Sequence, residues 1–167
     1  MALDRKGTIL GTTAYVGNTL VAEDVTISLP EVTPKTQTIN AMGDLELPLP
    51  LLEAMEASIT KVGLDKGFLK LIVPESRKFE FRWAQTVLKP DGTQKHEGCK
   101  AFITGVPKVT FPGGDITPGE NYEGAIPIAV TRYQLFVNGN EYILVDKLKG
   151  QYKINGKDYA QGIKNLL

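Results

Sequence analysis

The chain has very little of the chemistry on which enzymes and metal proteins rely. It contains one histidine, His96, and one cysteine, Cys99. A zinc site normally takes about four ligands, and catalysis by a cysteine–histidine pair needs both side chains on one surface. Residues three positions apart on a strand point to opposite faces, so this pair predicts neither a metal site nor a nucleophile. We expect a solvated His96, a small buried Cys99 and no enzyme activity.

Excess charge and long apolar runs are also missing. The 19 basic residues equal the 19 acidic ones, so the chain lacks the basic excess of a protein that wraps duplex DNA. No run approaches the roughly 18 apolar residues of a membrane span, and the first residues lack the apolar centre of a signal peptide. A single cysteine excludes an internal disulfide and fits a reducing compartment. These absences predict a protein made in the cytosol, without stable membrane insertion.

The remaining candidates for binding chemistry have simpler structural explanations. No Lys-Ser/Thr pair follows Gly113, Gly114 and Gly119, so these are predicted turn residues rather than a phosphate cradle. Arg82 and Trp83 would lie on alternate faces of one strand. This favours a core tryptophan and a solvated arginine over a grip on single-stranded nucleic acid. The sequence implies no cofactor and no catalytic residue.

What the chain does contain is a series of short alternating segments. Its 17 glycines and 10 prolines are scattered between them, as in an all-β sandwich or barrel. The first hairpin is predicted to turn at Gly17-Asn18. Val25–Leu29 and Phe79–Val87 alternate apolar and polar residues, while a helical stripe of about two turns falls between Leu64 and Pro74. We therefore predict a mainly β, antiparallel sandwich or small barrel with one short helix, folded as a single domain over residues 1–167.

Residues 51–62 fit two patterns. Leu51, Leu52, Met55 and Ile59 have helical spacing, and the residues between them have high helix propensity. The segment from Met55 to Ile59 also alternates apolar and polar residues, which favours a strand. The strand is our prediction and the helix is the alternative.

The strongest local signal is Asn138-Gly139, within the apolar-alternating run from Ile126 to Val145. A type I′ turn needs positive φ at both central residues, and Asn-Gly tolerates this best. Taking these two residues as the loop sets a register in which four apolar side chains share the core face. The predicted pairs are Leu135 opposite Tyr142 and Tyr133 opposite Leu144.

Two segments lack a regular pattern. Glu31–Pro50 is rich in proline and exceeds the ~12 to 15 residues of an ordinary loop, which predicts an assembly loop. Ordering a residue costs about 1 to 2 kcal/mol of backbone entropy, so we expect this loop to be mobile until neighbouring copies bind it. Its predicted contact residues are Pro34, Ala41, Met42, Gly43, Leu45, Leu47 and Leu49. A second predicted loop, Phe111–Asn121, contains Gly113, Gly114, Asp115 and Gly119.

Both ends of the chain contain recognisable stretches. The C-terminal third holds VTRYQLFVNGNE (Val130–Glu141), VDKL (Val145–Leu148), KINGKD (Lys153–Asp158) and a final NLL. The N-terminal part holds AYVGNT (Ala14–Thr19) and VTISLPEVTPKT (Val25–Thr36). In this order they resemble the major tail tube protein of contractile-tailed bacteriophages, and also the tube proteins of R-type bacteriocins. The resemblance spans nearly the whole chain.

This resemblance implies a structural subunit of the inner tail tube of a contractile injection machine. Hexameric rings would stack into a conduit for DNA or effectors, and the sheets of neighbouring subunits would join into a continuous inner barrel. The two irregular loops would reach the neighbouring ring. The implied barrel strands lie near Val25–Leu29, Met55–Val62, Cys99–Val109 and Tyr122–Val130.

The implied partners are other copies of the chain, the tail sheath, tape measure, baseplate and tail terminator proteins, and DNA that passes without sequence-specific binding. The implied location is the virion tail, assembled in the cytoplasm of the host bacterium. The sequence leaves two alternatives open. One is the tube of a headless bacteriocin or type VI-like secretion particle, and the other is a monomeric β-barrel that binds an oligonucleotide or a sugar.

Overall fold

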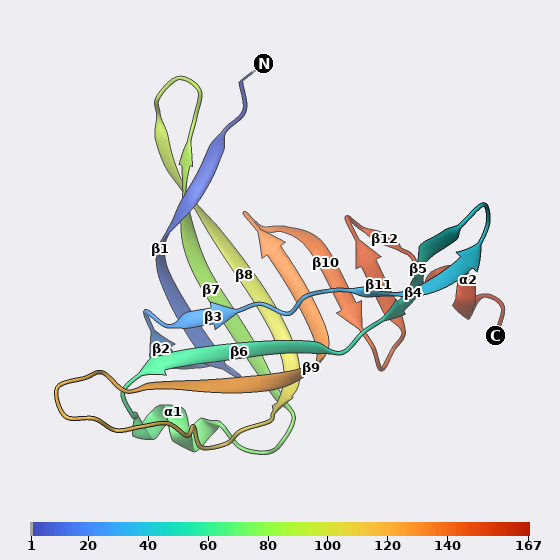
Figure 1. Ribbon diagram of the computed structural model, residues 1–167. Helices are drawn as coiled ribbons and strands as arrows, with labels where there is room; N and C mark the ends of the chain where they lie inside the picture. Colours follow the sequence, from blue (N-terminus) through green and yellow to red (C-terminus); the bar gives the residue numbers. More distant parts are fainter. Residues whose placement is uncertain (1) are drawn as a thin grey trace.

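The computed structural model describes residues 2–167, which form antiparallel strands and two very short helices (Figure 1). The strands are β1 (Arg5–Val16), β2 (Thr19–Glu23), β3 (Thr26–Ser28), β4 (Pro34–Asn40), β5 (Asp44–Leu52), β6 (Met55–Val62), β7 (Arg77–Leu88), β8 (Gln94–Pro107), β9 (Glu123–Val137), β10 (Asn140–Asp146), β11 (Gln151–Ile154) and β12 (Lys157–Asp158). The helices are α1 (Lys66–Leu71) and α2 (Gln161–Lys164). The predicted mainly β, antiparallel fold is thereby confirmed.

The strands are arranged in two layers that share β8 and β9. The large sheet has the order β12-β11-β10-β9-β8-β7-β1-β2, and β6 and β3 join it through the N-terminal half of β9. We call β3-β6-β9-β8 the inner sheet; in Figure 1 it crosses in front of the large sheet. A register shift opposite Thr104 and Gly105 separates the two halves of β9. The four strands of the inner sheet are those that the family resemblance places in the barrel.

Apolar side chains fill the space between the layers. Phe79 and Phe81 of β7 belong to one core cluster with Ile59 of β6 and Ile126 of β9, and all four are essentially buried. Full burial of such a side chain contributes about 1.5 to 3 kcal/mol. At one end of the core, α1 buries Phe68. These contacts determine how the inner sheet sits over the large one.

Several local predictions are confirmed. Residues 55–62 form the strand β6, so the helix alternative is wrong. The first hairpin turns at Gly17-Asn18, where Val16 faces Thr19. α1 falls within the predicted helical stripe and begins at Asp65, whose carboxylate accepts hydrogen bonds from the backbone N–H groups of Gly67 and Phe68. The nearby Lys61 ammonium, together with these backbone hydrogen bonds, lowers the pKa of the Asp65 carboxyl.

The register of the last hairpin differs from the prediction. Asn138 and Gly139 form the loop with φ of 51° and 80°, but Tyr142 bulges out of β10. Leu135 therefore faces Ile143 instead of Tyr142, and Tyr133 faces Val145 instead of Leu144. Tyr142 is 42% exposed, and Leu144 points to the face opposite the core cluster. Because residues 142–145 are all apolar, the sequence has no polar residue that would reveal the bulge.

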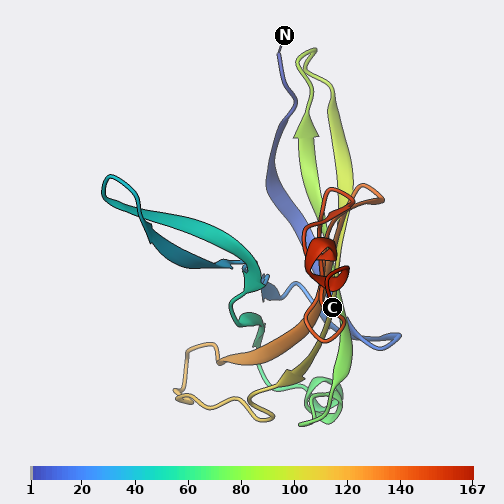
Figure 2. The same ribbon diagram turned by 90° about the vertical axis from the view of Figure 1, so that its right-hand side faces the viewer.

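Residues 31–50 are not the irregular loop predicted from the sequence. β4 and β5 pair as a separate two-stranded sheet, which we call the arm. Figure 2 shows that the arm stands away from both layers. Pro34 faces Leu52 and Pro48 faces Thr36 in its ladder. Prolines are tolerated here because each strand of a two-stranded ribbon is an edge strand, so their missing N–H groups break few ladder bonds.

The structure has a second helix where the sequence predicts only one. Gln161–Lys164 form α2 near the C-terminus. This helix has four residues and no buried side chain. A single turn is too short for hydrophobic periodicity to reveal.

Candidate assembly surfaces

The tip and sides of the arm expose apolar side chains. Residues 41–43 form the turn, in which Met42 has a φ of 52° and a fully exposed side chain. Ile39 faces Leu45 across the ladder, and Leu47 follows on the same strand. The exposed fractions of these three side chains lie between 37% and 46%. An isolated two-stranded ribbon is only marginally stable in water, so the arm suits burial against a partner.

The base of the arm is tied to the rest of the chain by hydrogen bonds. The backbone N–H of Glu53 donates to the carbonyl oxygen of Thr33 at 2.9 Å. Lys147, which follows β10, donates through Nζ to the carbonyl oxygens of Leu52 and Glu53 at 3.4 and 2.5 Å. An apolar hollow lies beside this base, lined by Pro34, Pro48, Leu49, Pro50, Tyr152, Ile154 and Tyr159. The direction of the arm is thus set at its base.

The predicted contact residues occupy distinct parts of the arm. Pro34 and Leu49 lie near the base and line the hollow. Ala41, Met42 and Gly43 form the turn, and Leu45 and Leu47 lie on exposed stretches of β5. The structure therefore gathers these residues on one protruding hairpin, from base to tip.

The second predicted loop, Phe111–Asn121, links β8 to β9 without helix or strand. The hydroxyl of Tyr122 donates to the carbonyl oxygens of Pro112 and Gly113 at 2.8 and 3.1 Å, which holds the two ends of the loop together. On this loop, Phe111 and Ile116 are 64% and 79% exposed. The predicted residues Gly113, Gly114, Asp115 and Gly119 are all exposed on this loop.

The inner sheet has two open edges. Over residues 2–167, β3 pairs only with β6, so its other edge keeps unpaired backbone donors and acceptors. At the far side of the sheet, β7 begins at Arg77 opposite Gly105, so the last residues of β8 pair with β9 alone. Open edges of this kind are templates for pairing with another chain.

The face of the inner sheet that points away from the core is mainly small and polar. By strand alternation it carries Thr26 and Ser28 of β3, and Ser58 of β6. Glu56 on the same face forms an ion pair with Lys108. Glu123 lies on the same face at the start of β9, opposite Val62, so this face carries one ion pair and one further carboxylate.

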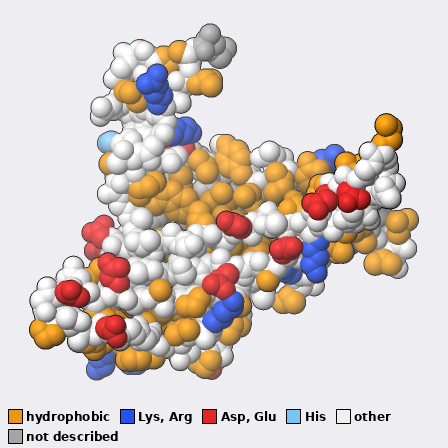
Figure 3. Space-filling model, viewed as in Figure 1, with side chains coloured by type: hydrophobic (Ala, Val, Ile, Leu, Met, Phe, Trp, Pro, Cys, Tyr) orange, Lys and Arg blue, Asp and Glu red, His pale blue; other side chains and the backbone are white. Residues whose placement is uncertain are grey.

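The large sheet carries an apolar band that the sequence did not reveal. Its six residues form two rows of cross-strand neighbours on the core-facing side, and all except the buried Cys99 are half-buried. Figure 3 shows hydrophobic side chains gathered here, between the N-terminal strand and the arm. The rows are Trp83–Cys99–Val137 and Leu135–Ile143–Ile154. Alternation predicts core positions for these residues, but β3 is too short to cover them.

A trough of about 630 Å³ crosses β1, β7, β8 and β9. Phe102 and Phe136, which alternate away from the core, pack edge to face there with ring centroids 5.6 Å apart. The guanidinium of Arg82 lies 4.4 Å from the ring centroid of Tyr15, and its Nε donates to Glu80 at 2.6 Å. Arg82 is thus partly solvated, as predicted, and is also held in place by stacking.

The two residues with candidate catalytic chemistry lie apart. His96 is exposed opposite Thr86, and Cys99 is buried opposite Trp83. Burial raises the pKa of the Cys99 thiol, which disfavours the reactive thiolate. Within residues 2–167, no group of three or more His, Cys, Asp or Glu is placed to hold a metal ion. In the same part of the chain, no helix is long and apolar enough to cross a membrane.

Comparisons with known proteins complete this description. The profile of the family described as Phage tail tube protein FII matches residues 7–167. Among solved structures, a chain of an extracellular contractile injection system, the PVC sheath-tube complex in its extended state, has a similar fold. The two chains are 13% identical with a TM-score of 0.50, and the alignment covers 75% of this chain and 87% of that chain. No curated protein sequence matches.

Proposed function

Because this chain belongs to the phage tail tube protein FII family, we propose that it closes into hexameric rings that stack into the hollow inner tube of a contractile tail. The chain is a tail tube subunit, a structural component of the virion tail rather than an enzyme. The family match over residues 7–167 is the observation that carries the proposal. Family membership also favours a tube subunit over a monomeric β-barrel that binds an oligonucleotide or a sugar.

Ring closure uses the two open edges of the inner sheet. The free edge of β3 pairs with the free end of β8 in the next copy, so that each subunit continues the sheet of its neighbour. Such a head-to-tail contact is heterologous, and repeated contacts of this kind form a closed ring. The mainly small and polar outward face of the inner sheet, which carries no excess of basic residues, then lines the lumen, where DNA passes without sequence-specific binding.

Stacking of rings uses the arm. Its apolar side chains and fully exposed Met42 reach a subunit of the adjacent ring, and Phe111–Asn121 provides a second contact there or within the ring. The outward trough beside Phe102 and Phe136 faces the sheath. The tape measure protein occupies the lumen before ejection, and the baseplate and terminator proteins bind the two ends of the tube.

Electron microscopy of the concentrated protein tests this proposal. We expect rings or tubes in negative stain, with a matching rise in light scattering. Replacing residues 41–49 with a Gly/Ser linker removes the apolar part of the arm and should leave rings but no tubes. A protein that stays monomeric at every concentration, even with a tail-tip initiator present, would overturn the proposal.

A further inference from the structure

The apolar band is a sheet face that its own chain leaves open. Trp83, Leu135 and Ile143 pack against the border of the core cluster, yet each stays half-buried. Beyond them the core-facing side of the large sheet is not covered by the inner sheet (Figure 3). A contiguous apolar surface rarely remains open in a monomer and marks an interaction site.

The position of the band relative to β3 indicates which molecule covers it. The free edge of β3 borders the uncovered part of the large sheet in Figure 1. Any strand that extends the inner sheet past this edge lies over the large sheet on the same side as β6 and β9. Under the proposed ring closure, the next copy supplies that strand from the end of its β8.

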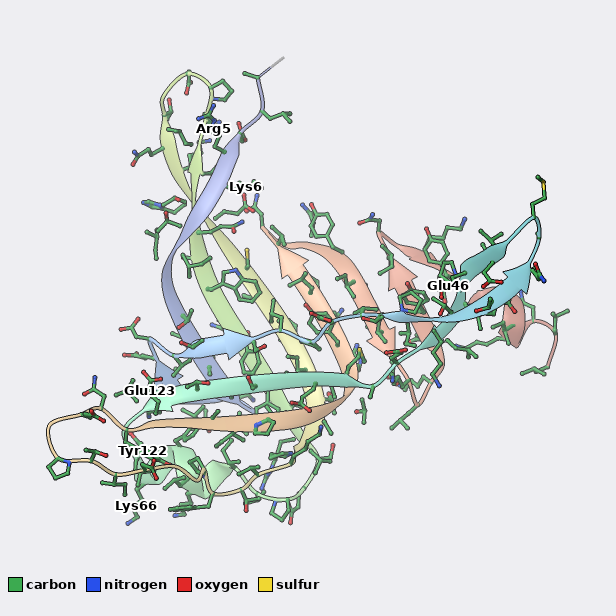
Figure 4. All side chains as sticks on the ribbon, viewed as in Figure 1. Arg5, Lys6, Glu46, Lys66, Tyr122 and Glu123 are labelled. Atoms are coloured by element: carbon green, nitrogen blue, oxygen red, sulfur yellow. The ribbon has the colours of Figure 1, made fainter. Side chains whose placement is uncertain are left out.

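The end of the molecule that carries the Phe111–Asn121 loop is suited to cover the apolar band of a neighbouring copy. Phe111–Asn121 follows directly after β8, so this loop travels with the strand that would pair with β3. In Figure 4, Tyr122 and Glu123 mark the end of the molecule that carries this loop, and Arg5 and Lys6 mark the other end. The exposed Phe111 and Ile116 provide apolar side chains of matching character.

We propose that the apolar band is covered in the assembled ring by the Phe111–Asn121 loop of the next copy. This proposal rests on the proposed function and specifies the surface that two ring neighbours share. The contact is heterologous, because the band of one copy receives the loop of the next. The contact buries apolar side chains that remain partly exposed at the border of the core in a single subunit.

The only tryptophan of the chain is a natural probe of this contact. Trp83 lies in the band, so coverage should shift its fluorescence emission to shorter wavelength and reduce acrylamide quenching several-fold when rings form. The measurement compares dilute monomer with assembled rings of the variant that carries the Gly/Ser linker in place of residues 41–49. Rings are used so that protection reflects contacts within a ring and not stacking.

Paired variants test both sides of the contact. Val137→Asp places a charge in the band, and its control, Ala84→Asp, places the same charge in the trough on the opposite face of the large sheet. Ile116→Asp tests the loop, and its control is Thr117→Asp in the same loop. We expect Val137→Asp and Ile116→Asp to give folded monomers, by near-ultraviolet circular dichroism, that lose ring formation. Both controls should form rings.

The possible outcomes separate this proposal from the proposed function. Rings with protected Trp83 support both. Rings or tubes in which Trp83 is quenched as readily as in the monomer overturn the covered band and leave the tube function standing. If Val137→Asp fails to fold, Ile116→Asp still decides, because rings of that variant with full Trp83 protection would also overturn the proposal.

Discussion

Nζ of Lys147 lies 2.5 Å from the carbonyl oxygen of Glu53, the residue between the end of the arm and the start of β6. This hydrogen bond joins the end of β10 to the base of the arm. The arm has no other strand beside it, so its direction depends on a few contacts at its base. Lys147 is therefore a positioning residue for the arm.

Replacing Lys147 with methionine should loosen the arm while preserving the length of the side chain. We expect faster amide exchange and faster proteolysis across residues 33–53, together with slower tube growth. The melting temperature should change little, because the Lys147 side chain is exposed and lies outside the buried core cluster. Lys149→Met is the control, since no hydrogen bond joins its side chain to the arm. Equal exchange rates in both variants would contradict the role of Lys147.

Gly105 is a position where the strands approach too closely for a side chain. A Cβ atom there would clash with the carbonyl oxygen of Ala129, and would lie 2.8 Å from Cγ2 of Ile128. Gly105→Ala should therefore destabilise the protein by about 1 to 3 kcal/mol through overpacking. Gly98→Ala on the same strand has open space around its Cβ and should be close to neutral. Urea unfolding of both variants measures the difference.

The observed hairpin register can be tested by truncating two residues that the sequence predicts to be partners. Leu135 is half-buried at the border of the core, so Leu135→Ala should cost about 2 kcal/mol, near the low end of values for core leucines. Tyr142 is exposed in the bulge, so Tyr142→Ala should stay within about 0.5 kcal/mol. If both variants lose a similar amount of unfolding free energy in thermal or urea unfolding, the register predicted from the sequence is favoured over the observed one.

Stability at alkaline pH should depend on Tyr133. Burial raises the pKa of its phenol from 10.0 to about 12, so the folded state keeps it neutral where the unfolded chain ionises it. Its contribution is fully present below pH 10 and is lost as the pH rises from 10 toward 12. Tyr133→Phe should remove this part of the alkaline loss of melting temperature, whereas Tyr142→Phe should not. If the melting temperature falls equally with rising pH in wild type and in Tyr133→Phe, ionisation of Tyr133 does not contribute to the alkaline loss of stability.

The arm should be the least protected paired region of the free subunit. It forms a ladder, but among the described residues its strands form no ladder with a third strand, and the apolar side chains near its tip remain exposed. We expect its amides to exchange much faster than those of β8 or β9 in the monomer, and to slow strongly in assembled tubes. Amide exchange followed by mass spectrometry decides this. Slow exchange across residues 34–52 of the monomer would show that the arm is already rigid.

The sequence predicted well wherever one local signal acted alone. The turns at Gly17-Asn18 and Asn138-Gly139 and the alternation of β7 follow from turn chemistry and periodicity. At residues 55–62 two patterns competed, and the alternation of apolar and polar residues predicted the strand correctly. Prediction from the sequence failed where the packing of a neighbouring element determines the local structure. The bulge at Tyr142 lies in a wholly apolar run, so the sequence contains no marker of the shift.

Of the candidate assembly surfaces, the sequence partly identified the arm and did not identify the apolar band. Proline content and length identified residues 31–50 as unusual, yet prolines concealed the ladder because they are normally read as strand breakers. The apolar band was hidden for a different reason. Trp83 and Leu135 alternate as core residues should, and only the three-residue length of β3 shows that the inner sheet ends before it covers them.

β8 and β9 each belong to both layers of the subunit, and this has a mechanical consequence. Two layers joined only by apolar packing can slide past one another under load, since packing contacts have no preferred direction. Here a shear between the inner sheet and the rest of the large sheet would be resisted by the continuous covalent backbone of β8 and β9. Rigidity against thrust along the tube is therefore already present in a single subunit, before any neighbour is added.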